Sequence, residues 1–304
     1  MGFGDSLVTR RAVVFGAAGQ LGVELMRELH SRYYATIGFD RGDLDITDGA
    51  AVESAVAGHE AGVVFNCAAY NQVDVAEREP EAAFQVNALA VRHMALACRQ
   101  ADARLVQFST DYVFDGFAHV PYAEDDHPHP LSAYAVSKLA GELYARAYLD
   151  KALIVRTSGV YGPGARNTAR GNFVETMMRL ACSRQPIRVV QDHVASPTFA
   201  PLLAARAVDL VERGQTGVFH IGGGAPISWF QFARLIFQAA GMDPLVLATN
   251  HREYRTAARR PQYSALSNAK MERLGLQPMP PVAKALEEYF ADRGRPARPA
   301  ESAS

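Results

Sequence analysis

The chain has 304 residues, of which 49% are hydrophobic and 21% charged, and its net charge is −1. This balance is typical of a globular protein with a large core, and it lacks the basic surface that attracts nucleic acid or anionic lipid. The sequence has no apolar run near the roughly 18 residues needed to cross a bilayer and three scattered cysteines, so we expect a cytoplasmic protein without nucleic-acid or membrane partners.

Short apolar runs alternate with helical patterns through the first half of the chain. The predicted strands are 11–15, 34–39, 62–66, 104–109 and 152–156, and the predicted helices are 23–29, 48–57, 80–100 and 132–149. Strict alternation of strand and helix predicts an α/β fold with a doubly wound parallel sheet of the Rossmann type.

The alternation loosens after about residue 161, where loops rich in glycine and proline separate the helices. The helices predicted there are 173–182, 200–213, 228–240 and 282–290. We therefore predict a dinucleotide-binding Rossmann domain at 9–160 and a smaller, mixed α/β substrate-binding region at 161–290. The polar, Pro- and Arg-rich segment 293–304 is predicted to be a disordered tail.

A glycine-rich turn, GAAGQLG at 16–22, joins the first predicted strand to the first helix. In this position Gly16 allows a sharp turn, Gly19 a close approach to a pyrophosphate, and Gly22 tight packing of helix on strand. The helix N-terminus then offers N–H groups and a positive dipole to the phosphates. The alternative is a glycine-rich turn without a ligand. The residues expected at the phosphates are Gly16, Gly19, Gln20, Leu21 and Gly22.

Asp40 and Arg41 end the second predicted strand and give conflicting signals about the cofactor. A carboxylate at this distance from the glycine turn binds the adenosine ribose of NADH, whereas an arginine accommodates the 2′-phosphate of NADPH. We expect both residues at the cofactor, with NADPH and NADH both accepted. The alternative is a solvated turn.

Tyr134 and Lys138 lie four residues apart in a predicted helix, so both side chains share one face. Alone, such a pair is most often a surface contact. Beside a dinucleotide, the ammonium and the nicotinamide charge would lower the phenol pKa from about 10. Tyr134 then protonates the substrate oxygen as hydride arrives, and Lys138 also reaches the cofactor ribose. Thr110, beside the C-terminal end of the strand 104–109, can donate a hydrogen bond to the same oxygen.

Nine stretches spread over nearly the whole chain carry a family resemblance. They are GAAGQLG at 16–22, LDITD at 44–48, NCAAYNQVDVAE at 66–77, STDYVFDG at 109–116, YAVSK at 134–138, RTSGVYG at 156–162, GNFVETM at 171–177, SPT at 196–198 and RRPQYSALSNAK at 259–270. With them the chain resembles the extended short-chain dehydrogenase/reductases, and within these the dTDP-4-dehydrorhamnose reductase family. STDYVFDG and the RRP segment are more specific than the glycine turn or Tyr-x-x-x-Lys, which the whole superfamily shares.

The resemblance implies a reaction, the NAD(P)H-dependent reduction of the 4-keto group of dTDP-4-dehydro-L-rhamnose to dTDP-L-rhamnose. It implies catalytic roles for Thr110, Tyr134 and Lys138. The resemblance further implies that Asp45, Ile46, Cys67, Ala68, Ala69, Tyr70 and Asn87 lie at the cofactor, and that Thr110, Asp111, Asn172, Phe173 and Arg260 lie at the sugar nucleotide.

The chain also departs from the family pattern. Gly159 stands where some members have a tryptophan, and His193 replaces a glutamine, so these residues do not fix the exact sugar. Some members form dimers around a magnesium ion held by glutamates. Glu24 and Glu288 match two of those positions but Pro201 occupies the third, so we predict no metal site and leave a homodimer open.

Two alternatives to the implied function remain. One is another nucleotide-sugar 4-ketoreductase on the same scaffold, because fold and catalytic residues do not choose the substrate. The other is a non-catalytic regulatory subunit, because the β subunit of methionine adenosyltransferase is similar to this family.

Overall fold

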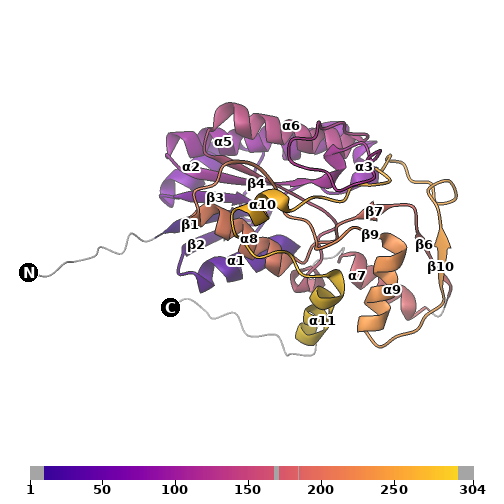
Figure 1. The fold of residues 1–304 in the computed structure, drawn as a ribbon. Coiled ribbons are helices and arrows are strands. Elements are labelled where there is room, and N and C mark those ends of the chain that lie inside the picture. The colour runs from indigo at the N-terminus through magenta and orange to yellow at the C-terminus, as the bar shows by residue number, and fades with distance from the viewer. Residues whose placement is uncertain (1–9, 168–170, 184, 294–304) are drawn as a thin grey trace, which may run out of the picture.

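A six-stranded, entirely parallel sheet forms the centre of the molecule (Figure 1). The computed structural model describes residues 10–167, 171–183 and 185–293. Of the tail predicted at 293–304, all residues after 293 lie outside the described residues. The strands run in the order β2-β1-β3-β4-β5-β8. Their bounds are Arg11–Phe15 (β1), Ala35–Phe39 (β2), Val63–Asn66 (β3), Arg104–Thr110 (β4), Ala152–Thr157 (β5) and Gly217–His220 (β8).

Helices cover both faces of this sheet, which confirms the predicted doubly wound α/β fold. On one face α1 (Gln20–Ser31) packs beside α8 (Ala200–Glu212), and on the other lie α2 (Gly49–Gly58), α5 (Ala90–Gln100) and α6 (Ala133–Tyr148) (Figure 1). Strand side chains alternate between the two cores because successive residues point to opposite faces. Thus Val14 of β1 packs with α1 and α8, whereas Val13 packs with α2 and α5.

The long helix predicted at 80–100 is interrupted by one π-helical segment. It consists of α4 (Pro80–Phe84), the π-helix η1 (Gln85–Leu89) and α5. Such wider turns re-aim side chains and are frequent at functional sites. Here the segment contains the buried Asn87.

A smaller layer beside the sheet contains short strands and three helices around a third apolar core. Tyr161, Phe232 and Tyr289 are at the centre of this core. Two strand pairs belong to this layer, β6 with β10 in parallel and β7 with β9 in antiparallel orientation. The bounds are Ile187–Val190 (β6), Val194–Ala195 (β7), Ile227–Ser228 (β9), Val246–Thr249 (β10), Phe173–Ala181 (α7), Trp229–Ala239 (α9) and Val282–Arg293 (α11). Four short helices complete the described elements: Val73–Ala76 (α3), Asp111–Val113 (η2), Pro163–Asn167 (η3) and Ala269–Arg273 (α10). Of these, α10 packs against the large sheet beside β8.

The chain returns to the large sheet after the predicted boundary at residue 160. Both α8 and β8 lie in the segment assigned from the sequence to the substrate-binding region, yet α8 covers the sheet and β8 pairs with β5. The boundary therefore does not separate the two layers. Within the described residues, no helix has both the length and the apolar character needed to cross a membrane.

Candidate active site

A cleft of about 1160 Å³ lies along the C-terminal ends of the parallel strands. The chain order reverses between β1 and β3, and open α/β sheets bind ligands outside such a reversal. Most of the residues predicted from the sequence line this one cleft. They are Gly16, Gly19, Gln20, Leu21, Asp40, Arg41, Asp45, Ile46, Cys67, Ala68, Ala69, Tyr70, Thr110, Asp111, Tyr134, Lys138 and Asn172. Four predicted residues, Gly22, Asn87, Phe173 and Arg260, lie outside its lining.

The glycine turn is shaped by close backbone contacts. Gly16 has a φ of +76°, and a Cβ there would lie 2.6 Å from the amide nitrogen of Ala68. A Cβ on Gly22 would lie 2.1 Å from the carbonyl oxygen of Gly16, so Gly22 allows the helix to pack on the turn. The first N–H groups of a helix have no intrahelical partner. Gly19, which precedes α1, provides no side chain to cap them. The turn and helix end together fit a pyrophosphate.

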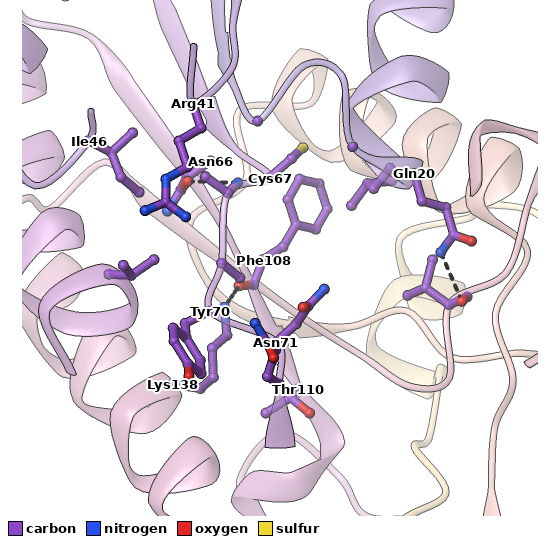
Figure 2. Close-up of a pocket in the computed structure, with 18 of the residues that line it drawn as sticks. Gln20, Arg41, Ile46, Asn66, Cys67, Tyr70, Asn71, Phe108, Thr110 and Lys138 are labelled. Atoms are coloured by element: carbon purple, nitrogen blue, oxygen red, sulfur yellow. Dashed lines mark hydrogen bonds between the residues drawn. The ribbon is translucent and has the colours of Figure 1, made fainter. Parts of the chain in front are cut away.

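The end of β2 presents an arginine to the cleft more directly than an aspartate. An Asp40 carboxylate oxygen accepts a hydrogen bond from the Gly42 amide at 2.7 Å, which engages it in the local turn. The Arg41 guanidinium extends into the cleft on the same side as Ile46 (Figure 2). Hydrogen bonds from Thr47, and then the positive charge of Arg41, hold the pKa of the Asp45 carboxyl below its usual range. The Arg41 guanidinium at the end of β2 can therefore bind a ribose phosphate.

Asn87 supports the loop after β3 and does not face the cleft. Its side-chain oxygen accepts a hydrogen bond from the Tyr70 amide at 2.9 Å, and its amide donates to the Tyr70 carbonyl at 3.0 Å. The same amide donates to the Ser137 hydroxyl of α6 at 2.9 Å. The π-helix thereby joins the loop 67–70 to the helix that carries Tyr134.

Lys138 is fixed deep in the cleft by a backbone atom. Its ammonium donates a 2.6 Å hydrogen bond to the carbonyl of Phe108 on β4 (Figure 2). Tyr134 lies one turn earlier on α6, which starts at the cap Ser132, whose hydroxyl accepts from the Ala135 amide. Burial lowers the pKa of Lys138 to about 8, while the Glu142 carboxylate opposes this shift.

Tyr134 is protonated at neutral pH in this site. Burial, the largest effect, raises the pKa of its phenol, and a hydrogen bond with Thr110 opposes the increase. In the chain alone, desolvation of the phenolate dominates, and the lowering expected from Lys138 and the charge of a bound nicotinamide stays a prediction. The arrangement suits a proton donor, with the Thr110 hydroxyl beside it.

Asp111 is a buried carboxyl directly behind Thr110. It accepts hydrogen bonds from the hydroxyls of Ser158 at 2.7 Å and Ser264 at 2.5 Å, and from Thr110 at 3.2 Å. Burial raises its pKa to about 6, and these hydroxyl groups limit the increase. The carboxyl joins the ends of β4 and β5 to the C-terminal segment, so it orients Thr110 as well as facing the cleft.

Asn172 and Phe173, at the start of α7, have different roles. The Asn172 side chain caps α7 by accepting from the Glu175 amide at 2.9 Å and donates to the Gln20 side chain at 2.8 Å. Gln20 in turn donates to the carbonyl of Val160 (Figure 2). Phe173 instead packs on Trp229, with ring centroids 4.7 Å apart. Asn172 therefore lines the cleft, and Phe173 packs in the core behind it.

Arg260 lies in a neighbouring pocket of about 440 Å³, together with His193 and Arg259. Its guanidinium makes two hydrogen bonds to the Asp74 carboxylate, at 2.7 and 3.0 Å. Burial of the arginine lowers its pKa, but Asp74 and Tyr112 together more than offset this effect through hydrogen bonds and charge, so the pKa is raised. In this structure Arg260 joins the C-terminal segment to α3.

Gly159 forms part of the cleft where a larger residue would not fit. Its φ is +49°, and a Cβ there would lie 3.0 Å from the indole of Trp229 on α9. The left-handed backbone and the indole both disfavour a side chain at this position. The indole thus limits the width of the cleft behind Gly159.

Asn66 and Phe108 line the cleft but were not predicted. Asn66 donates a hydrogen bond to the Gln107 side chain at 2.7 Å and accepts one from the Ala68 amide. A polar residue at the end of the apolar run VVFN was the available signal. Phe108 contributes its carbonyl to Lys138, and a backbone atom leaves no signal in the sequence. Among the described residues, no group of three His, Cys, Asp or Glu side chains could hold a metal ion.

Comparison with known proteins agrees with this geometry. The family model described as the RmlD substrate binding domain matches residues 10–294. A dTDP-4-dehydrorhamnose reductase of Streptomyces griseus is 41% identical over 95% of this chain and 96% of its own length. The chain belongs to the dTDP-4-dehydrorhamnose reductase family. The resemblance stated from the sequence motifs is thus confirmed.

Other relatives show the range of this family. A crystal structure of dTDP-4-dehydrorhamnose reductase from Bacillus anthracis in complex with NADP superposes with a TM-score of 0.89 at 37% identity, covering 94% of this chain and all of that chain. A dTDP-4-keto-6-deoxy-D-glucose reductase of Streptomyces niveus is 36% identical over 93% of this chain and 97% of its own. Relatives named for different sugars thus align over nearly the whole length of this chain.

Proposed function

We propose that the chain reduces the 4-keto group of dTDP-4-dehydro-L-rhamnose to dTDP-L-rhamnose with NADPH or NADH. One observation carries the proposal: a single cleft contains the glycine turn together with Thr110, Tyr134 and Lys138. Membership of the family gives the sugar class. We further propose that the Rossmann layer binds the dinucleotide and that segments from 161–290 bind the sugar nucleotide.

The cofactor would extend from the glycine turn to Lys138. The N-terminus of α1 would bind the pyrophosphate, and Arg41 the ribose or its 2′-phosphate. When bound, a reduced nicotinamide supplies hydride to the keto carbon. Because the Arg41 guanidinium extends into the cleft while Asp40 is engaged with Gly42, we expect NADPH to bind more tightly than NADH.

Tyr134 would donate its phenolic proton to the keto oxygen as that oxygen gains charge. The raised pKa of the phenol keeps the proton in place until the oxygen becomes more basic. Thr110 would donate a hydrogen bond to the same oxygen, with Asp111 orienting its hydroxyl. Lys138, held at the Phe108 carbonyl, would bind the nicotinamide ribose and replace the proton that Tyr134 loses.

Spectrophotometric assay of NADPH and NADH oxidation with dTDP-4-dehydro-L-rhamnose tests the proposal. We expect turnover in the wild type and loss of turnover with retained NADPH binding in Tyr134→Phe, because only the proton donor is removed. Unimpaired turnover in Tyr134→Phe would refute the proposed mechanism. Arg41→Ala should reduce the preference for NADPH over NADH.

Reduction of dTDP-4-keto-6-deoxy-D-glucose is the second candidate. The Streptomyces niveus relative named for this activity is 36% identical and aligns over 93% of this chain. Parallel assays with the two sugars decide between them by their kcat/KM ratio. NADPH binding without turnover of either sugar, together with co-purification of a synthetase, would instead support the regulatory subunit.

A further inference from the structure

Glu142 is a fully buried carboxylate that faces no part of the cleft. It lies on α6 one turn after Lys138 and two turns after Tyr134, so the three side chains share one face of the helix. Its side chain is only 2% exposed. A carboxylate is seldom buried this deeply unless charged or donor groups surround it.

Two consecutive residues of β4 hold Lys138 and Glu142. The Phe108 carbonyl accepts a hydrogen bond from the Lys138 ammonium at 2.6 Å, and the Ser109 hydroxyl donates to Glu142 at 2.5 Å. Adjacent strand residues point to opposite sides, yet here a backbone carbonyl and the next side chain both meet α6. The catalytic turn of the helix is therefore fixed to the strand at two points.

Arg156 completes this buried group from the neighbouring strand. It pairs in register with Ser109, and its guanidinium donates to both Glu142 oxygens at 2.8 to 3.2 Å. The guanidinium also lies 5.3 Å from the centre of the Phe114 ring, which limits its movement. Glu142 thus accepts hydrogen bonds from β4 and β5 while its charge acts on Lys138.

The groups that face Lys138 come from several elements. Glu142 comes from α6, Cys67 from the loop after β3, and Arg156 from β5 through Glu142. Tyr134 shares the α6 face of Lys138 one turn earlier. Burial raises the pKa of the Cys67 thiol, which keeps it neutral. Asp111, after β4, acts on Tyr134. Of the groups that act on the Lys138 ammonium in the described part of the chain, Glu142 is therefore the one that carries a negative charge.

We propose that Glu142 is a positioning residue of the active site, which keeps Lys138 charged and aligned at the Phe108 carbonyl. The proposal rests on the proposed reductase function for its catalytic meaning. The effect of Glu142 on the charge of Lys138 does not depend on which sugar the protein reduces. Without the carboxylate, the buried ammonium would lose its proton at a lower pH.

Lysine side-chain NMR gives a direct test, because the chain has four lysines, at 138, 151, 270 and 284. Lys138→Met identifies the Lys138 signal in protein with isotope-labelled lysine. In the wild type we expect a titration midpoint near pH 8. In Glu142→Gln we expect the midpoint to fall by about one pH unit or more, with a parallel shift in the pH dependence of NADPH binding.

Asp209→Asn is the matched control. Asp209 is a partly buried carboxylate that pairs with Arg32 and Arg206, on the sheet face away from α6. This variant removes the same charge from another ion-pair network and should leave the Lys138 midpoint unchanged. A Glu142→Gln protein that loses stability but keeps the wild-type midpoint would overturn the proposal.

A second variant covers the case in which Glu142→Gln does not fold. Removing one partner of a buried pair leaves an unpaired charge, whereas replacing both partners by neutral groups is better tolerated. Glu142→Gln combined with Arg156→Met should fold and still show a lowered Lys138 midpoint. An unchanged midpoint in this double variant also refutes the proposal. If the wild type titrates as expected but reduces no dTDP sugar, only the proposed function fails.

Discussion

Lys138 combines a buried ammonium with a pKa lowered to about 8, so its charge changes within the ordinary working range of an enzyme. Below this pH the side chain is charged and can hold both the Phe108 carbonyl and a cofactor ribose. We expect the dissociation constant of NADPH to be constant below about pH 8 and to rise by up to about tenfold per pH unit above it. Fluorescence titration of NADPH across this range measures the effect.

Arginine at the same position separates charge from other effects of pH. Arg stays protonated throughout this range, so Lys138→Arg should bind NADPH more weakly than the wild type but with a flat pH profile. A profile that still rises near pH 8 in this variant would assign the titration to another group.

Gly159 shows how one missing side chain sets the shape of the cleft. Its left-handed φ of +49° costs any other residue about 1–2 kcal/mol, and a Cβ would also approach the Trp229 indole to 3.0 Å. We expect Gly159→Ala to reduce the free energy of unfolding and to raise KM for the sugar nucleotide. Gly241→Ala is the control, since Gly241 has a φ of +65° with no atom near its Cβ position. Equal losses in urea unfolding would show that the indole contributes nothing.

At the scale of elements, the π-helix η1 matters because it aims Asn87 at two other parts of the site. Asn87→Ala removes three hydrogen bonds to Tyr70 and Ser137 and leaves buried backbone groups unpaired, which costs about 1–3 kcal/mol. We expect weaker NADPH binding as well as a lower Tm, because the loop 67–70 lines the cleft.

Asn268→Ala provides the comparison for this prediction. Asn268 makes the same pair of backbone hydrogen bonds, to the amide and carbonyl of Gly222, away from the cleft. It should lower the Tm similarly and leave NADPH binding unchanged. Loss of NADPH affinity in both variants would mean that general destabilisation is the cause.

Elements with strong local patterns were predicted well, and their exceptions have physical reasons. The helix predicted at 132–149 is α6, because a serine cap and an alanine-rich run mark it. The π-helix was read as continuous helix because one extra residue per turn barely changes an apolar pattern. The strand β8 was missed because four residues, at 217–220, carry too little periodicity and follow the predicted boundary.

At the scale of the whole molecule, the Asp74–Arg260 pair joins segments 186 residues apart. We expect Asp74→Asn to raise KM for the dTDP sugar several-fold with little change in NADPH binding, because Arg260 loses its fixed orientation. The Asp74 side chain is 43% exposed, so the stability change should stay below about 1 kcal/mol. Glu253→Gln, at the exposed Arg188–Glu253 pair, should leave KM unchanged. A lower KM in Asp74→Asn would show instead that Asp74 competes with the substrate for Arg260.

The candidate site was predictable to the extent that motifs place residues at strand ends. Gly16, Arg41, Cys67 and Thr110 line one cleft because parallel strands end at one edge. The partners of Arg260 and Lys138 could not be read from the sequence. The partner of Arg260 is the Asp74 carboxylate, distant along the chain, and the partner of Lys138 is the Phe108 backbone carbonyl. Only the folded chain brings each residue to its partner.

The position of β8 in the chain, long after its neighbour β5, affects folding during synthesis. Every residue of β5 is buried, yet β5 remains the outer strand of the sheet until residue 220 has left the ribosome. Synthesis of the intervening segment takes roughly 3 to 13 seconds at about 5–20 residues per second. During that time the outer edge of β5 has no partner and can pair with other nascent chains. A fragment ending at residue 160 would keep this edge permanently, so it should aggregate, whereas the same chain extended past β8 and α10 should remain in solution.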